Sequence, residues 1–342
     1  MEASQPRNLF RTTITIILSI VFAAVFMWLA VKDMDFTKIK SAFLRANYWW
    51  IAISAIFGLL AYWLRAVRWN LLLEPLGYRV SNKSSLWSIS FGYLMNLTIP
   101  RSGELARATA LYGAEGVAVE KSFGTIILER VVDLACMMLF LCLTLFFKYE
   151  ALLAFYRFAT QESAAGSQNG KALWIWLILG AGLLSTVLFF VFRKKLEAVA
   201  LFSKIYKIAD GLWLGVSSIF KLKNPLKFIL YSLAIWICYY LAAYVVCFAL
   251  PETSDFGITD GFFIIVVGTL GMMVPASGGI GAFHYALKIG VGALFLSTGN
   301  TFSAGEEAGL SYAFLSHTLQ MVIMLVMGII AIPALARMRQ NR

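Results

Sequence analysis

Two polar interruptions in an otherwise apolar sequence contain the residues best suited to bind an ionic group. The first reads Asn96-Leu97-Thr98-Ile99-Pro100-Arg101-Ser102-Gly103-Glu104 and is followed by Arg107, and the second reads Val274-Pro275-Ala276-Ser277-Gly278-Gly279-Ile280-Gly281. Both contain Pro-x-Ser-Gly, and because proline removes a backbone donor while glycine admits left-handed backbone, each should end a helix. Helix N-termini carry partial positive charge, so a helix that starts near Ser102 or Gly281 is expected to receive an anion such as phosphate. The guanidinium groups of Arg101 and Arg107 would add full charge.

A second charged cluster, Glu129-Arg130-Val131-Val132-Asp133, opens a long apolar run. Glu129 and Asp133 are four residues apart and share one face of a helix, so they should repel unless a cation lies between them. We expect that cation to be Arg101, Arg107 or Arg130. Ionisable residues inside a membrane mark either a function or a structural pair, and both interpretations stay open here.

The composition predicts the class of protein. Hydrophobic residues make up 60% of the chain, charged residues 14%, and the mean hydropathy is +0.78, which is typical of a polytopic helical membrane protein. The 29 Lys and Arg against 18 Asp and Glu are then interpreted as a bias across the bilayer and not as a nucleic-acid site. Four cysteines inside apolar runs and two unclustered histidines predict no metal site, and we expect no cofactor.

We expect six spans, at residues 12–31 (an N-terminal anchor), 48–66, 123–147, 172–192, 227–250 and 310–333. The basic segment 193–225 should lie in the cytoplasm, either as an amphipathic helix on the anionic inner leaflet or as a plain loop. Both termini would then be cytoplasmic. Arg65 and Arg68 should mark the cytoplasmic end of the second span, residues 32–47 a short interfacial helix, and residues 149–171 an outside loop.

The same charge pattern makes residues 84–121 begin and end in the cytoplasm, and residues 261–300 begin and end outside. Two re-entrant helical hairpins of opposite orientation are the simplest account, with tips at Pro100–Gly103 and Pro275–Gly281. The predicted fold is therefore one all-α membrane domain, residues 1–342, with repeat 1 at 48–147, a linking part at 172–225 and an inverted repeat 2 at 226–333. Chance recurrence of Pro-x-Ser-Gly is the alternative.

Taken in order, these motifs resemble the lysylphosphatidylglycerol synthase transmembrane-region family, also called the flippase-like domain family of bacterial and archaeal inner-membrane proteins. The resemblance covers nearly the whole chain. It implies an inner-membrane protein with a flippase-type fold, which moves a phospholipid or a polyprenyl-linked lipid between leaflets.

The sequence departs from that family in two places. Better-known members carry a soluble domain that transfers an aminoacyl group from transfer RNA, whereas this chain ends at Arg342 soon after its last predicted span, so we expect no aminoacyl transfer. His284 stands where an acidic residue often follows the glycines. It could be a proton-sensitive group or a packing imidazole, and His317 is interpreted as structural.

The sequence thus predicts a lipid transporter, with membrane lipids as its partners, no nucleic acid, no catalytic residues and an oligomeric state that stays open. A membrane-embedded lipid-modifying transferase with Glu104, Glu129 or Asp133 as base is one alternative, and an ion-coupled small-solute transporter is the other. The predicted substrate-binding residues are Asn96, Pro100, Arg101, Ser102, Gly103, Glu104, Arg107, Glu129, Arg130, Asp133, Pro275, Ser277, Gly278, Gly279, Gly281 and His284.

Overall fold

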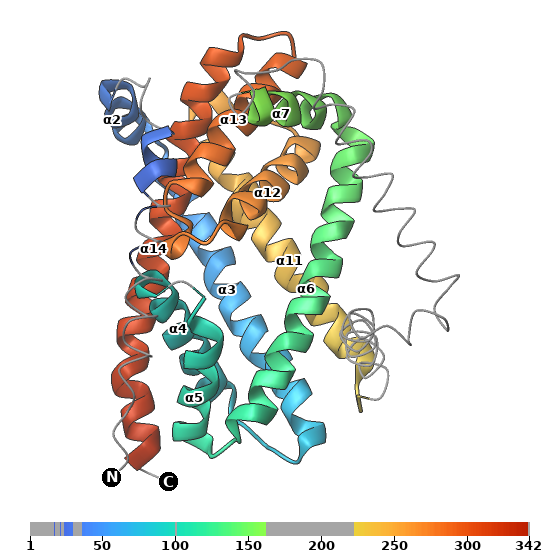
Figure 1. Cartoon of the computed structure of the whole chain (residues 1–342), viewed down its shortest axis with the longest axis vertical. Helices are drawn as coiled ribbons and strands as arrows, with labels where there is room; N and C mark the ends of the chain where they lie inside the picture. The colour runs from blue at the N-terminus through green and yellow to red at the C-terminus, as the bar shows by residue number, and fades with distance from the viewer. Residues whose placement is uncertain are drawn as a thin grey trace, which may run out of the picture. The chain divides into compact units, whose positions relative to one another are not determined.

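The computed structural model describes residues 17, 21, 24–29, 36–99, 101–161 and 222–340, and within these ranges it consists of helices and loops (Figure 1). Contacts divide the chain into two units, Met1–Phe155 with Leu222–Arg342 and Tyr156–Lys221, and the features below belong to the first. The α-helices are α2 (Phe36–Arg45), α3 (Tyr48–Leu73), α4 (Asn82–Thr98), α5 (Gly103–Glu115), α6 (Val119–Phe147), α7 (Tyr149–Gln161), α11 (Pro225–Val246), α12 (Ile258–Met273), α13 (Ala282–Ser297) and α14 (Phe302–Gln340). Short 3-10 turns are η1 (Glu74–Leu76), η3 (Cys247–Ala249), η4 (Pro251–Thr253) and η5 (Ser277–Gly279).

Four helical segments in the described ranges are long and apolar enough to cross a membrane: Tyr48–Leu76, Pro225–Ala249, Ser277–Ser297 and Phe302–Gln340. Three of them coincide closely with the predicted spans 48–66, 227–250 and 310–333. The other, Ser277–Ser297, belongs to the segment that was predicted to form half of the second hairpin. α6 covers the predicted span 123–147 but is not among the four.

Several predicted segments fall outside the described ranges. Of the predicted anchor 12–31 only positions 17, 21 and 24–29 are described, and the span 172–192 and most of the basic segment 193–225 are not. Pro100, at the predicted first tip, is also outside.

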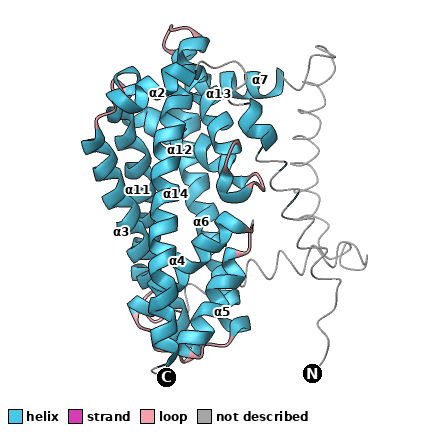
Figure 2. Cartoon of the chain, turned by 90° about the vertical axis from the view of Figure 1, so that its left-hand side faces the viewer, coloured by secondary structure: helices cyan, strands magenta, loops and turns pink. Residues whose placement is uncertain are grey.

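The long helix α14 runs past two shorter helices that follow one another along it (Figure 2). Its first half packs on α13, where a Cβ on Gly309 would lie 2.5 Å from the carbonyl oxygen of Leu287. Its second half packs on α4, where a Cβ on Gly328 would meet the side chain of Leu94. α13 has 16 residues and α4 has 17, about 24 and 26 Å of helix, so each α-helix alone is shorter than the ~30 Å hydrocarbon core, whereas α13 together with η5 is long enough to cross it.

α4 and α13 each pack closely against a second short helix. A Cβ on Gly103 at the start of α5 would lie 2.4 Å from the Gly92 carbonyl oxygen of α4. A Cβ on Gly271 of α12 would lie 2.9 Å from the Ala282 carbonyl oxygen of α13. The two helix pairs expected from the sequence, α4 with α5 and α12 with α13, are therefore present, and their position in a bilayer stays a prediction.

The turn between α4 and α5 touches the turn between α12 and α13. Arg101, which has a left-handed φ of 58°, donates from Nη2 to the carbonyl oxygen of Met273 at the end of α12, over 3.1 Å. A Cβ on Gly278 would lie 2.9 Å from the side chain of Leu97. The Gly278 carbonyl oxygen also lies 2.9 Å from Nε2 of His317 in the middle of α14.

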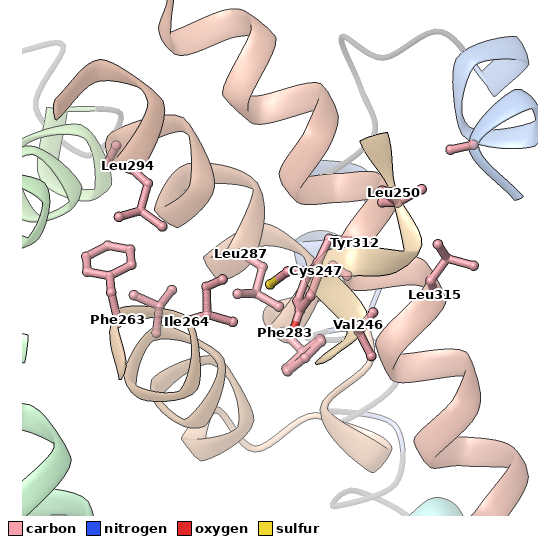
Figure 3. Close-up of a cluster of buried hydrophobic side chains, with 14 of the residues drawn as sticks. Val246, Cys247, Leu250, Phe263, Ile264, Phe283, Leu287, Leu294, Tyr312 and Leu315 are labelled. Carbon is pink, nitrogen blue, oxygen red and sulfur yellow. The ribbon is translucent and has the colours of Figure 1, made fainter. Parts of the chain in front are cut away.

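Each helix pair has its own apolar core. Phe263 and Ile264 of α12, Phe283 and Leu287 of α13, and Tyr312 of α14 pack together in the first core (Figure 3). A separate core holds α4 and α5 against α3 and α6, and its largest members are Trp69, Leu73, Ile89, Leu111 and Ile126. Burying such side chains contributes roughly 1.5–3 kcal/mol each where water is the alternative, and somewhat less where lipid is.

Three helix boundaries differ from the sequence prediction. α7 occupies the start of the predicted loop 149–171, because Ala151, Leu152 and Phe155 recur at helical spacing and pack into the first core. α14 continues through Pro333 to Gln340. Proline removes one backbone hydrogen bond from the helix, a loss that membrane helices tolerate. α3 extends to Leu73, so Arg65 and Arg68 lie within it and not at its end.

Candidate functional site

A buried network of ionic groups joins α3, α5 and α6. Glu129 and Asp133 lie one turn apart on α6, and the guanidinium of Arg68 from α3 lies between them. Nη1 of Arg68 is 2.8 Å from Oδ1 of Asp133, and Nη2 is 3.3 Å from Oε1 of Glu129. Nη1 also donates to the hydroxyl of Ser232 on α11, over 3.2 Å. The expectation of a cation between the carboxylates is therefore correct, but the cation is Arg68, which was not among the arginines predicted for this place.

Arg107 of α5 completes the pairing of Glu129. Its Nη2 lies 2.5 Å from Oε2 of Glu129, and its guanidinium carbon is 3.9 Å from the ring centroid of Trp69. The indole Nε1 of Trp69 in turn donates to Thr125 of α6 over 2.8 Å. Arg107 thus holds α5 to α6 through a charge pair with Glu129, and to α3 through a cation–π contact with Trp69.

Two further arginines approach Asp133 from either side. Nη1 of Arg65 lies 3.8 Å from its Oδ2 and donates to the hydroxyl of Tyr239 over 3.0 Å. Nη1 of Arg130 also lies 3.8 Å from this Oδ2, and Nε of Arg130 is 3.7 Å from the carboxylate of Glu104. Arg130 is 44% exposed and Glu104 31%, so this pair forms the open edge of the network.

The buried part of the network carries more positive than negative charge. Arg65, Arg68 and Arg107 are each at most 4% exposed and face only two carboxylates, Glu129 and Asp133. Arg130 and Glu104 balance each other at the edge. Counted over the described residues, the buried network therefore has one positive charge in excess. Because an uncompensated buried charge is costly, the site favours an anion.

A cavity of about 370 Å³ lies beside this network. Arg65, Arg130 and Asp133 form its polar end, while its remaining walls are largely aromatic and aliphatic side chains of α3, α4, α11, α12, α13 and α14. A much smaller hollow of about 10 Å³ lies between Asn96, Glu104 and Arg107, enough for about one water molecule. The larger space therefore combines charged and apolar walls in one cavity.

Residues of the first predicted tip mainly bind one another. Oδ1 of Asn96 accepts a hydrogen bond from the Gly103 amide over 2.8 Å, so it occupies a donor at the N-terminus of α5. The hydroxyl of Ser102 donates to the carbonyl oxygen of Ile99 over 2.7 Å. Arg101 is exposed and contacts Met273, so it does not pair with Glu129 or Asp133 as the sequence led us to expect.

The second predicted tip is formed by left-handed glycines. Gly278, Gly279 and Gly281 have φ values of 59°, 77° and 82°, a region that glycine adopts without strain. Pro275 is exposed and Ser277 begins the short turn η5.

His284 is buried at the start of α13. Its ring centroid lies 4.4 Å from that of Phe314 and 5.0 Å from that of His317, and its Nδ1 accepts weakly from the Gly281 amide over 3.4 Å. This environment suits a packing imidazole. The neighbouring His317, which was assigned only a structural role, contacts the Gly278 carbonyl oxygen of the tip.

The structure thus brings Glu104, Arg107, Glu129, Arg130 and Asp133 into one network, and it places the two tips in contact with each other. Sequence reasoning missed Arg65 and Arg68. Their signal was two cations three residues apart within an apolar helix, a spacing that puts both on one face. No group of three or more His, Cys, Asp or Glu side chains in the described ranges could hold a metal ion.

Helices of membrane-spanning length beside a largely buried ionic network define a multi-pass membrane protein. The chain belongs to the lysylphosphatidylglycerol synthase TM region family, which matches residues 16–328, so the resemblance seen in the sequence is confirmed. It is also similar to a UPF0104 membrane protein of Methanocaldococcus jannaschii, with 29% identity over 139 residues, 40% of this chain and 39% of that protein. The match therefore spans about two fifths of the relative's length. No solved structure matches the chain.

Proposed function

We propose that this protein moves an anionic lipid, a phospholipid or a polyprenyl-linked lipid, between the two leaflets of the cell membrane. The observation that carries this proposal is the excess buried positive charge at one end of a largely apolar cavity. A lipid has the same two parts, a charged headgroup and apolar chains. The arginine-rich end suits the headgroup, and the aromatic and aliphatic walls suit the first part of the chains.

The arrangement of the short helices supports the same function. α4 and α13 follow one another along α14, and each has a partner helix, α5 or α12, that turns back at the point where the two tips touch. We propose that these pairs are re-entrant hairpins entering from opposite faces, so that the two parts of the chain form an inverted repeat. Broken helices that meet near the midplane allow one repeat to move against the other and so expose a site to each side in turn.

Basic residues set the proposed orientation. The segment 193–225 and the C-terminal Arg337, Arg339 and Arg342 would face the cytoplasm, as would the N-terminus. The loops near Asp260 and Asn300 would face the outside. The anionic inner leaflet would then attract the basic segment.

Within this function, the charged residues have different roles. Arg65 and Arg130 line the cavity and would contact the headgroup. Arg68, Arg107 and Glu129 lie behind them and hold α3, α5 and α6 together, while Asp133 also reaches the cavity wall. Because both α6 carboxylates are bound by arginines, neither is placed as a general base, so transport is favoured over a transferase reaction.

Translocation in liposomes tests the proposal. The purified full chain is reconstituted, and a fluorescent phosphatidylglycerol is followed as a membrane-impermeant reductant bleaches the outer leaflet, with and without an imposed pH gradient. We expect the protein to increase the bleached fraction beyond the outer-leaflet half seen in protein-free liposomes. The same bleaching as in protein-free liposomes, for phosphatidylglycerol and for a labelled polyprenyl phosphate, would refute the proposed function.

A further inference from the structure

We infer that Tyr62, Arg65 and Trp236 form a binding site for a singly charged phosphodiester inside the large cavity. This inference rests on the proposed function, because it names the group of the transported lipid that the protein recognises. The ligand chemistry is the phosphate oxyanion, which a lipid headgroup or a free phosphate ion could supply.

Four buried hydrogen-bond donors, in side chains that line the cavity, have no partner among the described residues. They are the hydroxyl of Tyr62, Nε and Nη2 of Arg65, and Nε1 of Trp236. All three side chains line the cavity, and these residues are 9%, 3% and 7% exposed, respectively. Tyr62 and Arg65 are three residues apart on α3, and Trp236 belongs to α11, which packs beside α3 (Figure 1).

These groups are held in place by contacts that leave the four donors unpaired. Nη1 of Arg65 donates to the Tyr239 hydroxyl over 3.0 Å, which fixes the guanidinium while Nε and Nη2 stay unpaired. The Tyr62 ring packs on Tyr93 with centroids 4.9 Å apart, and the Trp236 ring stacks on Phe140 at 5.7 Å. The site is therefore preorganised by aromatic packing, and its polar atoms are not used for that packing.

Donors of this kind select the ligand by their chemistry. The indole and guanidinium N–H groups donate and do not accept, so the ligand must supply acceptor oxygens. Each buried donor left unpaired is unfavourable, and a phosphate group offers several oxygens in a geometry that a guanidinium binds with two parallel bonds.

The net charge of the buried network narrows the class of ligand further. One positive charge is in excess among its buried members, and a phosphodiester carries one negative charge at neutral pH, so binding would leave the site neutral. The cavity is also lined by Phe283 and Leu287, whose side chains Figure 3 shows next to Tyr312. A phosphodiester that carries hydrocarbon chains matches both the charged and the apolar parts of this lining.

Single substitutions that remove one donor and keep the ring test the site directly. In Tyr62→Phe and Trp236→Phe, we expect the dissociation constant for short-chain phosphatidylglycerol to rise about tenfold each. Because the lost donors have no partner in the described protein, the melting temperature without lipid should stay the same or rise. Arg65→Gln should weaken binding more than either, and Arg65→Lys should restore it in part.

Tyr240→Phe is the matched control. Tyr240 lies on α11 one turn after Trp236, but its hydroxyl donates to the Ile258 carbonyl oxygen over 2.9 Å and it does not line the cavity. Losing this paired hydroxyl should lower the melting temperature and leave lipid binding unchanged. The control and the test variants thus have opposite expected results, which separates a ligand site from a structural role.

Three ligands complete the measurement: phosphatidylglycerol, a diacylglycerol of equal chain length, and inorganic phosphate. Weaker binding of diacylglycerol supports the oxyanion site, and competition by inorganic phosphate at similar concentration would assign it to the free ion. Equal binding of phosphatidylglycerol and diacylglycerol, or unchanged binding in both Phe variants, would overturn the inference. If liposomes show no translocation while these binding differences hold, the site stands and the proposed function fails. If liposomes show translocation but the binding differences are absent, the proposed function stands and the site inferred here fails.

Discussion

The guanidinium of Arg68 lies 2.8 Å from the carboxylate of Asp133, although 65 positions separate the two residues in the chain. The side chain of Arg68 is fully buried, and it also lies 3.3 Å from Glu129. One cation therefore bridges two carboxylates on a single face of α6. This contact ties α3 to α6 beside the cavity.

Replacing this cation should be strongly destabilising. In Arg68→Gln, Glu129 keeps Arg107 but Asp133 loses its closest partner in a buried site. We expect a loss of about 1.5–3 kcal/mol in the free energy of unfolding, because the charge-assisted hydrogen bonds of Arg68 are lost while Arg65 and Arg107 still balance the two carboxylates. Denaturant titration of the protein in detergent micelles measures this loss.

Arg45→Gln serves as the control, because Arg45 is 55% exposed in its pair with Glu252. Exposed pairs contribute about 0–1 kcal/mol, so this variant should unfold almost as the parent does. If the two variants lost similar amounts of stability, the network would not be the buried structure described above.

Two glycines of α5 should respond in opposite ways to the same substitution. A Cβ on Gly103 would lie 2.4 Å from the Gly92 carbonyl oxygen and 2.5 Å from Asn96, so Gly103→Ala should force α4 and α5 apart and cost roughly 1–3 kcal/mol. A Cβ on Gly113 would meet nothing within 4 Å, so Gly113→Ala should stabilise the helix by up to about 1 kcal/mol. Melting temperatures of the two variants compare these effects, and a shift of the same sign in both would contradict the close packing of α4 on α5.

Arg101 connects the two tips at the cost of an unfavourable backbone conformation. Its φ of 58° suits glycine, so Arg101→Gly should keep or raise the melting temperature, while the bond to the Met273 carbonyl oxygen is lost. Arg101→Gln should also break that bond but retain the strain. We expect both variants to translocate lipid more slowly than the parent, and full translocation by both would show that this contact has no part in transport.

Accessibility of single cysteines tests the proposed orientation of the helix pairs. On a background without native cysteines, Lys121→Cys should react with an impermeant reagent from the cytoplasmic side, and Asn300→Cys should react from the outside. Lys121 lies in the first turn of α6, soon after α5, and Asn300 lies between α13 and α14. Reaction of both positions from the same side would exclude an inverted repeat.

The sequence predicted much of the fold because its signals were local. Apolar runs of sufficient length indicated the helices α3, α11 and α14, and Pro-x-Ser-Gly indicated where helices break near Ser102 and Ser277. The spacing of Glu129 and Asp133 indicated that a cation must lie between them. Each of these inferences depends on residues that are neighbours in the chain or one helical turn apart.

Contacts between residues that are far apart in the sequence were harder to predict, because they depend on how the helices pack. Arg68 was placed at a membrane surface, since positive charge near the end of an apolar run usually lies there, whereas in the structure α3 continues to Leu73 and buries it. Arg101 was expected to reach the carboxylates, but its left-handed backbone directs it to Met273. The unpaired donors of Tyr62 and Trp236 leave no trace in the sequence, because only the folded chain determines which polar atoms lack a partner.

The most direct measurement of the central claim is phosphatidylglycerol translocation by Arg65→Gln in liposomes, with Arg45→Gln as the matched control. Both substitutions remove one arginine, but Arg65 lines the cavity and Arg45 lies in an exposed pair with Glu252. We predict that Arg65→Gln lowers the translocation rate at least about tenfold at a similar melting temperature, and that Arg45→Gln has the parent rate. A parent rate in Arg65→Gln, with the protein shown to be folded, would contradict the account.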